Sequence, residues 1–451
     1  MPHFVATMRR RIARKLSGRP FFKSVVLLSG GTAAAQVITI LSTPIVTRLY
    51  QPEHFGILTV FVSILGIVIP LATLRYAVAI PIAEDEGLAD DVLRLCFVII
   101  FTLAIFFAMG LLLFGPTICR HYPDSNVSTY FWLLPFCLFG AGLYQALSSW
   151  SLRDKQFKLL ARTRMTQGVS SATTKIALGA LGVRPLGLLL GYFTTQVTGS
   201  GSILMALVRQ KPGFFRKYSW RGMWRAAKRF VRFPLLQSWS QLLLALGVQL
   251  PALLIAAFYN VKAAGFYGLA FNMVNMPMNI LGQSIAQVYF AEIAKYGKAR
   301  PDKILSLSVS LLKKLFVLGA IPAAVIMAVG PHMFGLVFGE EWREAGGYAQ
   351  LLSVLVLLRF VSVPVAHCLN VLERQGLQII INSIRVLLVV AVFTFCRFQG
   401  FNVHTTVLIY SISISVMYLA LAGTIFQLLR ALVREMPSSP STSPQTHDGK
   451  L

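Results

Sequence analysis

Two long apolar runs joined by a short polar link dominate the start of the chain. The runs cover residues 25–46 and 55–80, and the link covers residues 47–54. A helix needs about 20 consecutive apolar residues to cross the hydrocarbon core of a bilayer. Each run is long enough, so this segment is predicted to form a transmembrane helical hairpin.

Further apolar runs follow along the whole chain, which is 56% hydrophobic and only 13% charged. A membrane β-barrel needs strands of about ten residues with strict alternation, whereas these runs are unbroken and longer. We predict an all-α polytopic membrane protein whose first helix is retained. Twelve spans are expected, at residues 24–47, 55–80, 95–117, 130–150, 165–183, 186–208, 233–258, 265–290, 315–338, 348–370, 377–396 and 405–428.

The basic residues favour one side of the predicted membrane. Of the 42 Lys and Arg residues, 32 fall in the two tails and the loops on their side, and six fall in the opposite loops. Because cytoplasmic loops retain Lys and Arg, both termini are predicted to be cytoplasmic. The net charge of +26 then reflects topology and attraction to anionic lipids, and no nucleic-acid partner is expected.

The same distribution predicts how the chain is divided. The predicted parts are a basic tail (1–23), a first helical bundle (24–208), a basic linker (209–232), a second bundle (233–428) and a C-terminal tail (429–451), partly disordered. The linker is expected to be either a simple basic connection or an amphipathic segment along the membrane interface.

A weak internal repeat supports two related halves. Residues 50–58 are similar to residues 259–267, and a Tyr is followed by a Gly six positions later in both. Secondary transporters are often built from such paired halves.

Few residues offer catalytic or metal chemistry. The five cysteines include no CxxC pair, the histidines show no metal-ligand spacing, and no nucleotide-binding glycine loop occurs. The acidic residues at 84–86 and 90–91 are predicted to form a solvated turn. No enzyme activity, metal or cofactor is therefore expected.

Four basic residues lie inside the predicted spans, whereas no Asp or Glu lies well inside one. Charges within a membrane are costly and are functional candidates by default, although those near a span end can instead extend to the interface. A carrier of cations needs buried carboxylates, and guanidinium groups match phosphate oxygens. We predict an anion-binding pathway formed by Arg75, Lys175, Arg359 and Arg385, with Arg48 at its outer mouth.

Uncharged polar residues form stripes at helical spacing. In the eighth span, five amides are spaced 3, 4, 4 and 4 residues apart and so share one helix face. Such stripes can join helices, but they also suit sugar hydroxyls in a water-filled lumen. The amides predicted to bind substrate are Asn272, Asn275, Asn279 and Gln283 of that stripe, with Gln36 in the first span and Gln241 in the seventh.

Three segments resemble the oligosaccharide flippases of the Wzx type: residues 29–36, 44–56 and 83–86. These flippases form the polysaccharide-transporter branch of the multidrug/oligosaccharidyl-lipid/polysaccharide (MOP) exporter superfamily. The resemblance implies two six-helix bundles around a central cavity and alternating access in a bacterial inner membrane. It implies cargo consisting of undecaprenyl-diphosphate-linked sugar repeat units, and a polysaccharide polymerase and a chain-length regulator as partners.

Two other functions remain open at this point. The first is a cation-coupled drug or metabolite antiporter of the related multidrug branch, against which the acid-free spans argue. The second is a membrane enzyme such as a polymerase or ligase.

Overall fold

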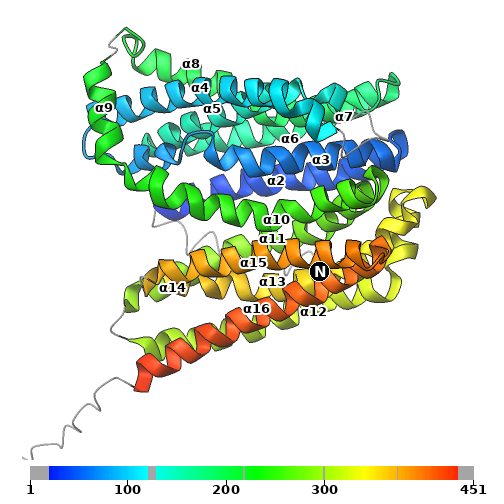
Figure 1. Cartoon of the computed structure of the whole chain (residues 1–451). Helices are drawn as coiled ribbons and strands as arrows, with labels where there is room; N and C mark the ends of the chain where they lie inside the picture. Colours follow the sequence, from blue (N-terminus) through cyan, green and yellow to red (C-terminus); the bar gives the residue numbers. More distant parts are fainter. Residues whose placement is uncertain (1–19, 120–127, 217–218, 298–299, 373, 435–451) are drawn as a thin grey trace, which may run out of the picture.

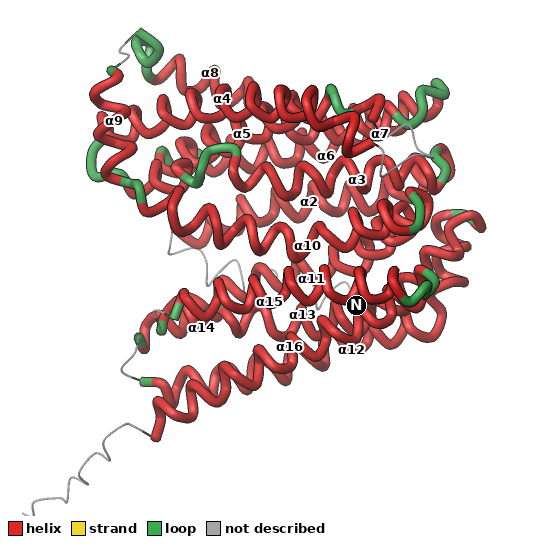
Figure 2. Tube along the Cα trace, viewed as in Figure 1, coloured by secondary structure: helices red, strands yellow, loops and turns green. Residues whose placement is uncertain are grey.

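The structure is a computed structural model that describes residues 20–119, 128–216, 219–297, 300–372 and 374–434, and of the side chains of residues 20–29 it gives no description. Within these ranges the chain is helical apart from short loops and turns, and no strand occurs (Figure 2). The predicted all-helical architecture is confirmed.

Every predicted span falls on one helix or on consecutive helical elements. The first half contains α2 (Pro20–Leu49), α3 (Pro52–Val68), η1 (Ile69–Leu71), η2 (Tyr76–Ile82), α4 (Glu86–Cys119), η3 (Ser128–Tyr130), α5 (Leu133–Arg153), α6 (Phe157–Ala180), α7 (Leu186–Val197) and α8 (Ser200–Gln210). The linker contains α9 (Trp220–Arg229). The second half contains η4 (Phe233–Gln237), α10 (Ser238–Phe258), α11 (Val261–Tyr296), α12 (Pro301–Phe338), η5 (Glu340–Trp342), α13 (Arg343–Ala366), α14 (Cys368–Val371), α15 (Gln375–Phe398) and α16 (Val403–Arg434).

Eight helical stretches of the described chain are long and apolar enough to cross a bilayer, by length and composition. They belong to α2, α3, α4, α10, α12, α13, α15 and α16. The other four predicted spans correspond to α5, α6, the α7–α8 pair and α11. The chain is a multi-pass membrane protein.

Two predicted spans are interrupted in the structure. The span 55–80 ends its regular helix at Val68, because Pro70 follows and has no N–H to continue the helical hydrogen bonds. Leu74 and Arg75 then adopt left-handed backbone angles, with φ of 44° and 64°. The span 186–208 breaks at Gly199, whose φ is 94° and where a Cβ would meet the side chain of Thr163.

The long helices lie side by side in two groups (Figure 1). Helices α2 to α8 form one group and α11 to α16 the other, and α10 packs against both α3 and α15. Helix α9 crosses one end of the first group, at a steep angle to the long helices (Figure 1). The basic linker therefore runs across the ends of the bundle helices.

The two repeated segments meet where α3 and α11 begin. Glu53 in the first turn of α3 forms an ion pair with Lys262 in the first turn of α11, at 3.0 Å. Close by, the indole Nε1 of the buried Trp342 donates a hydrogen bond of 3.0 Å to the backbone carbonyl of Thr47. The two halves are therefore closely joined at this end.

Candidate substrate cavity

Two of the predicted basic residues line the same cavity. Arg359 on α13 and Arg385 on α15 both face a space of about 880 Å³. Its wall is formed by η4, α10, α13, α14, α15 and α16, and among the described lining residues only Pro70 comes from the first half of the chain. Residues 26 positions apart in the sequence are thus brought together by the packing of the second half.

Arg385 is buried, and no carboxylate of the described residues pairs with it. The residue is 6% exposed, and its Nε has no hydrogen-bond partner. Its side chain packs on Gly247 of α10, where a Cβ would lie 2.6 Å from Arg385 Cδ. Its guanidinium carbon lies 5.2 Å from the ring centroid of Tyr418. A cation–π contact contributes about 0.5–2 kcal/mol, which is less than the cost of removing a guanidinium from water. This group is therefore suited to receive an anion.

Arg359 lies where two cavities meet. A second space of about 570 Å³ runs between α11 and α13 and shares Arg359, Val363 and His367 with the larger one. Its other walls are mainly apolar and include Met278 and Phe290, with Asn275 as a polar member. Arg359 thus borders both chambers, and the smaller one has fewer polar side chains in its described lining.

Neither cavity contains an acidic side chain. The described residues that line both spaces include two arginines, one histidine and several amides, but no Asp or Glu. The ion pairs that the structure records lie elsewhere, in loops and at helix ends. The electrostatic character of the cavities is therefore positive.

Amide side chains line the larger cavity from two facing helices. The polar lining residues other than Arg359 and Arg385 include Gln237, Ser240, Gln241, Gln249, Gln378 and Asn382. Gln378 and Asn382 were missed by the sequence analysis. They precede Arg385 by seven and three positions, so they share its face of α15. The helical spacing around a buried arginine could have identified both.

Five of the other predicted site residues are absent from the described linings of these two cavities. Lys175 faces a small space of about 50 Å³ together with Thr39, Ser42, Thr43 and Ser171, in the first half. Arg75 is half-buried in the turn between η1 and η2, and its Nε has no partner. Gln36 is half-buried on α2, whereas Arg48 at the end of α2 and Asn272 on α11 are exposed.

Two members of the predicted amide stripe cannot be placed. The side chains of Asn279 and Gln283 lie outside the described part of the structure, although the backbone of α11 passes through both positions. Within the described part, Asn275 and Gln287 of this stripe face the smaller cavity. The roles assigned to all these residues remain predictions.

Comparison with known proteins identifies the family. Residues 45–346 match the family model described as "Polysaccharide biosynthesis protein". The chain belongs to this family. The match runs from the end of α2 to the start of α13 and includes both repeated segments. It is consistent with the resemblance predicted from the N-terminal motifs.

Two curated relatives are similar over part of their length. The chain is 26% identical to the teichuronic acid biosynthesis protein TuaB of Bacillus subtilis over 52% of this chain and 48% of that protein. It is 33% identical to the lipopolysaccharide biosynthesis protein WzxC of Escherichia coli over 32% of this chain and 29% of WzxC. The aligned part of the chain thus spans about half or less of each relative.

The fold is shared with solved transporters. A multidrug resistance transporter of the MATE family, in the MOP superfamily and in an inward-facing conformation, matches with a TM-score of 0.68 at 15% identity, over 89% of this chain and 96% of that chain. This likeness confirms the predicted fold of about twelve membrane helices in two bundles. The family match and the similarity to WzxC agree with the predicted resemblance to Wzx-type proteins.

Proposed function

We propose that this protein is a flippase, which moves oligosaccharide repeat units linked to undecaprenyl diphosphate from the cytoplasmic to the outer leaflet of a bacterial inner membrane. The observation that carries the proposal is Arg385, buried at 6% exposure with an unpaired Nε in a cavity whose described lining has no carboxylate. The family supports a role in polysaccharide synthesis.

The charge of the cavity favours an anionic passenger. Uncompensated guanidinium groups in a membrane are expensive, and phosphate oxygens satisfy them with bidentate hydrogen bonds. Arg359 and Arg385 line one chamber, so both can face the same diphosphate. An inside-negative potential would favour outward movement by about 2.3 kcal/mol per elementary charge per 100 mV.

The shape and polarity of the cavities suit a passenger with three chemically different parts. The larger chamber, with its amides, offers hydrogen bonds to sugar hydroxyls beside the arginines. Its volume of about 880 Å³ is near the upper end of ordinary ligand pockets, which span about 300–1,000 Å³. The more apolar chamber between α11 and α13 adjoins Arg359 and can take the first part of the prenyl chain.

Translocation requires the two bundles to move against each other. In our proposal residues 24–208 and 233–428 act as the two units, the linker 209–232 connects them, and both termini are cytoplasmic. Contacts between the halves at Glu53–Lys262 and Trp342–Thr47 would open and re-form as access alternates. No bond in the passenger is made or broken, so the protein acts without enzymatic chemistry, and a polymerase and a chain-length regulator are its expected partners.

A double substitution tests the proposal. Arg359→Gln with Arg385→Gln removes both charges while keeping side chains that can hydrogen bond. We expect loss of surface polysaccharide and accumulation of the lipid-linked unit in the inner leaflet, with normal protein in the membrane. Arg397→Gln, at the exposed end of the same helix α15, is the matched control and should export normally. Normal export by the double variant would refute the proposal.

The alternative is a cation-coupled drug or metabolite antiporter. We consider it because the fold is shared with a multidrug transporter. Such a carrier needs a buried carboxylate to bind its cation. Expression in a dye-sensitive host distinguishes the two functions. Resistance to cationic dyes that survives the double Arg→Gln substitution would favour the antiporter.

A further inference from the structure

The linker helix α9 has three distinct faces. Gly222, Met223 and Ala226 are buried against the first bundle. Trp220 and Trp224, four positions apart, form a second face and are 64% and 58% exposed. Arg221, Arg225 and Lys228 follow at spacings of four and three on a third, exposed face beside the tryptophans. An aromatic stripe thus runs next to a basic one.

The buried face fixes α9 on the bundle. A Cβ at position 222 would overlap the carboxylate of Asp91, so α9 lies very close to that side chain. Tyr76 Oη donates a hydrogen bond of 3.1 Å to the carbonyl of Ala227, and Arg229 forms an ion pair with Glu84. The orientation of the other two faces is therefore set by the bundle.

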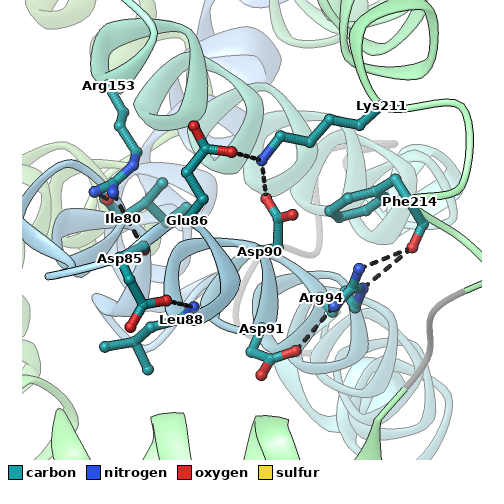
Figure 3. A network of polar contacts seen from close by, with 10 residues as sticks. All are labelled: Ile80, Asp85, Glu86, Leu88, Asp90, Asp91, Arg94, Arg153, Lys211 and Phe214. Carbon is teal, nitrogen blue, oxygen red and sulfur yellow. Dashed lines mark hydrogen bonds and ion pairs between the residues drawn. The ribbon is translucent and has the colours of Figure 1, made fainter.

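Three of the acidic residues, Glu86, Asp90 and Asp91, also hold the linker before α9, whereas Asp85 accepts a hydrogen bond from the amide of Leu88 (Figure 3). Lys211 Nζ lies 2.7 Å from Asp90 and 3.5 Å from Glu86, and Arg94 pairs with Asp91 at 2.9 Å (Figure 3). The guanidinium of Arg94 also donates to the carbonyl of Phe214, at 3.1 and 3.2 Å. These acids thus bind the linker instead of forming only a solvated turn.

The basic face remains free of acidic partners. No ion pair joins Arg221, Arg225 or Lys228 to a carboxylate within the described ranges; Lys228 Nζ instead lies 5.3 Å from the ring centroid of Trp224. Beyond α9, Leu235 in η4 and Trp239 in α10 are also exposed. Apolar side chains are thus exposed at the start of the next long helix as well.

From these faces we infer that α9 is an interfacial element that binds the anionic phospholipid headgroups of the adjacent leaflet. Helix α9 crosses the end of the bundle (Figure 1), so it lies close to parallel to the surface of a bilayer that the long helices cross. Indole rings favour the boundary between headgroups and acyl chains, and basic side chains beside them attract anionic headgroups. Because α9 is fixed to Asp91, Glu84 and Tyr76, lipid held there would also orient the first bundle.

Lipid retention tests the basic face. The full-length protein is purified with phosphatidylglycerol present, and the bound lipid is counted by native mass spectrometry. We expect Arg221→Gln, Arg225→Gln and Lys228→Gln together to lower phosphatidylglycerol retention on the order of tenfold, since each charge near the surface contributes to binding. The matched control is Lys155→Gln, Lys158→Gln and Arg162→Gln, three exposed charges elsewhere on the first bundle, which should retain the lipid. Equal retention by the two triple variants would overturn the inference.

Tryptophan quenching tests the aromatic face. The protein is placed in vesicles of brominated phosphatidylcholine, with and without phosphatidylglycerol. Quenching should be greater in wild type than in the Trp220→Phe, Trp224→Phe variant, and the difference should grow with phosphatidylglycerol. Equal quenching of wild type and the double Trp→Phe variant would show that these indoles do not contact lipid and would refute the inference. Arg221→Lys with Arg225→Lys keeps the charge and should behave as wild type, which separates charge from folding.

Discussion

Gly56 and Gly265, the equivalent glycines of the two repeated segments, pack against each other's helices. A Cβ on Gly265 would overlap the carbonyl of Pro52 and meet the amide nitrogen of Gly56, and a Cβ on Gly56 would overlap the carbonyl of Val261. The repeat therefore places one glycine on each side of the contact between α3 and α11, where the backbones approach too closely for any side chain.

Alanine at Gly265 should weaken this contact. The added methyl group would force α3 and α11 apart, and overpacking of this kind costs about 1–3 kcal/mol. We expect a lower Tm in detergent and reduced transport. Gly423→Ala is the control, since a Cβ there has no neighbour within 4 Å and alanine favours a helix by up to about 1 kcal/mol. Similar Tm changes in both variants would contradict this account.

Alanine at Gly247 should act on the cavity and spare the fold. Its Cβ would lie 2.6 Å from Cδ of Arg385, and that flexible side chain can shift more easily than a backbone. We expect transport to fall several-fold while Tm changes little. Gly347→Ala on α13, where a Cβ meets open space, should leave both unchanged. Normal transport by Gly247→Ala would show that the position of Arg385 is not critical.

The two arginines of the cavity could be predicted from the sequence, because a charged side chain inside a membrane is costly and therefore rare. Arg359 and Arg385 stand out in the sequence as basic residues within apolar runs, and the structure places both on one cavity. The sequence could not show that Lys175 and Arg75 lie elsewhere, because helical periodicity gives the face of one helix and not its neighbours. The turn at Leu74 and Arg75 and the break at Gly199 depend on backbone angles that hydropathy does not report.

The acidic residues at 84–86 and 90–91 were predicted to form only a solvated turn, and the sequence missed their contacts for a related reason. Their carboxylates stand at a helix start, which is typical of a solvated turn, and their partners Lys211 and Arg229 lie more than a hundred residues away. Only the folded chain brings these charges together. Ion pairs between distant loops leave no local pattern in a sequence.

Releasing the linker should make it accessible to proteases. Asp90→Asn removes one carboxylate from Lys211, whose Nζ lies 2.7 Å from Asp90 in a partly buried pair. We expect faster cleavage around residues 211–219 by trypsin in proteoliposomes. The charge swap Asp90→Lys with Lys211→Asp should restore protection at Arg216, a trypsin site that all these variants keep. Asp154→Asn, at an exposed position, should not change it. Unchanged cleavage of Asp90→Asn would show that other contacts hold the linker.

Loss of the Trp342 indole should loosen the contact between the halves. Phenylalanine keeps most of the ring packing against Phe55, whose centroid is 4.7 Å away, but loses the 3.0 Å hydrogen bond to the Thr47 carbonyl. A buried hydrogen bond contributes about 0.5–1.5 kcal/mol, and the unpaired carbonyl adds to the cost. We expect Trp342→Phe to unfold at a lower temperature than Trp132→Phe, which alters an exposed ring. Equal unfolding temperatures of the two variants would show that the hydrogen bond from Trp342 does not stabilise the protein.

Adding a carboxylate to the cavity tests its positive charge most directly. Gln241 lines the same chamber as Arg359 and Arg385, and Gln241→Glu changes its charge with almost no change in shape. A glutamate there would supply the arginines with an internal counter-ion and compete with phosphate oxygens for them. We expect at least a tenfold loss of export and, in the same membranes, no change in protein level. Gln241→Leu separates the loss of the amide from the gain of charge, because it removes hydrogen bonding without adding a carboxylate. If the leucine variant fails as badly as the glutamate variant, the amide matters more than the charge; if the glutamate variant exports normally, the passenger does not depend on the arginines for its binding.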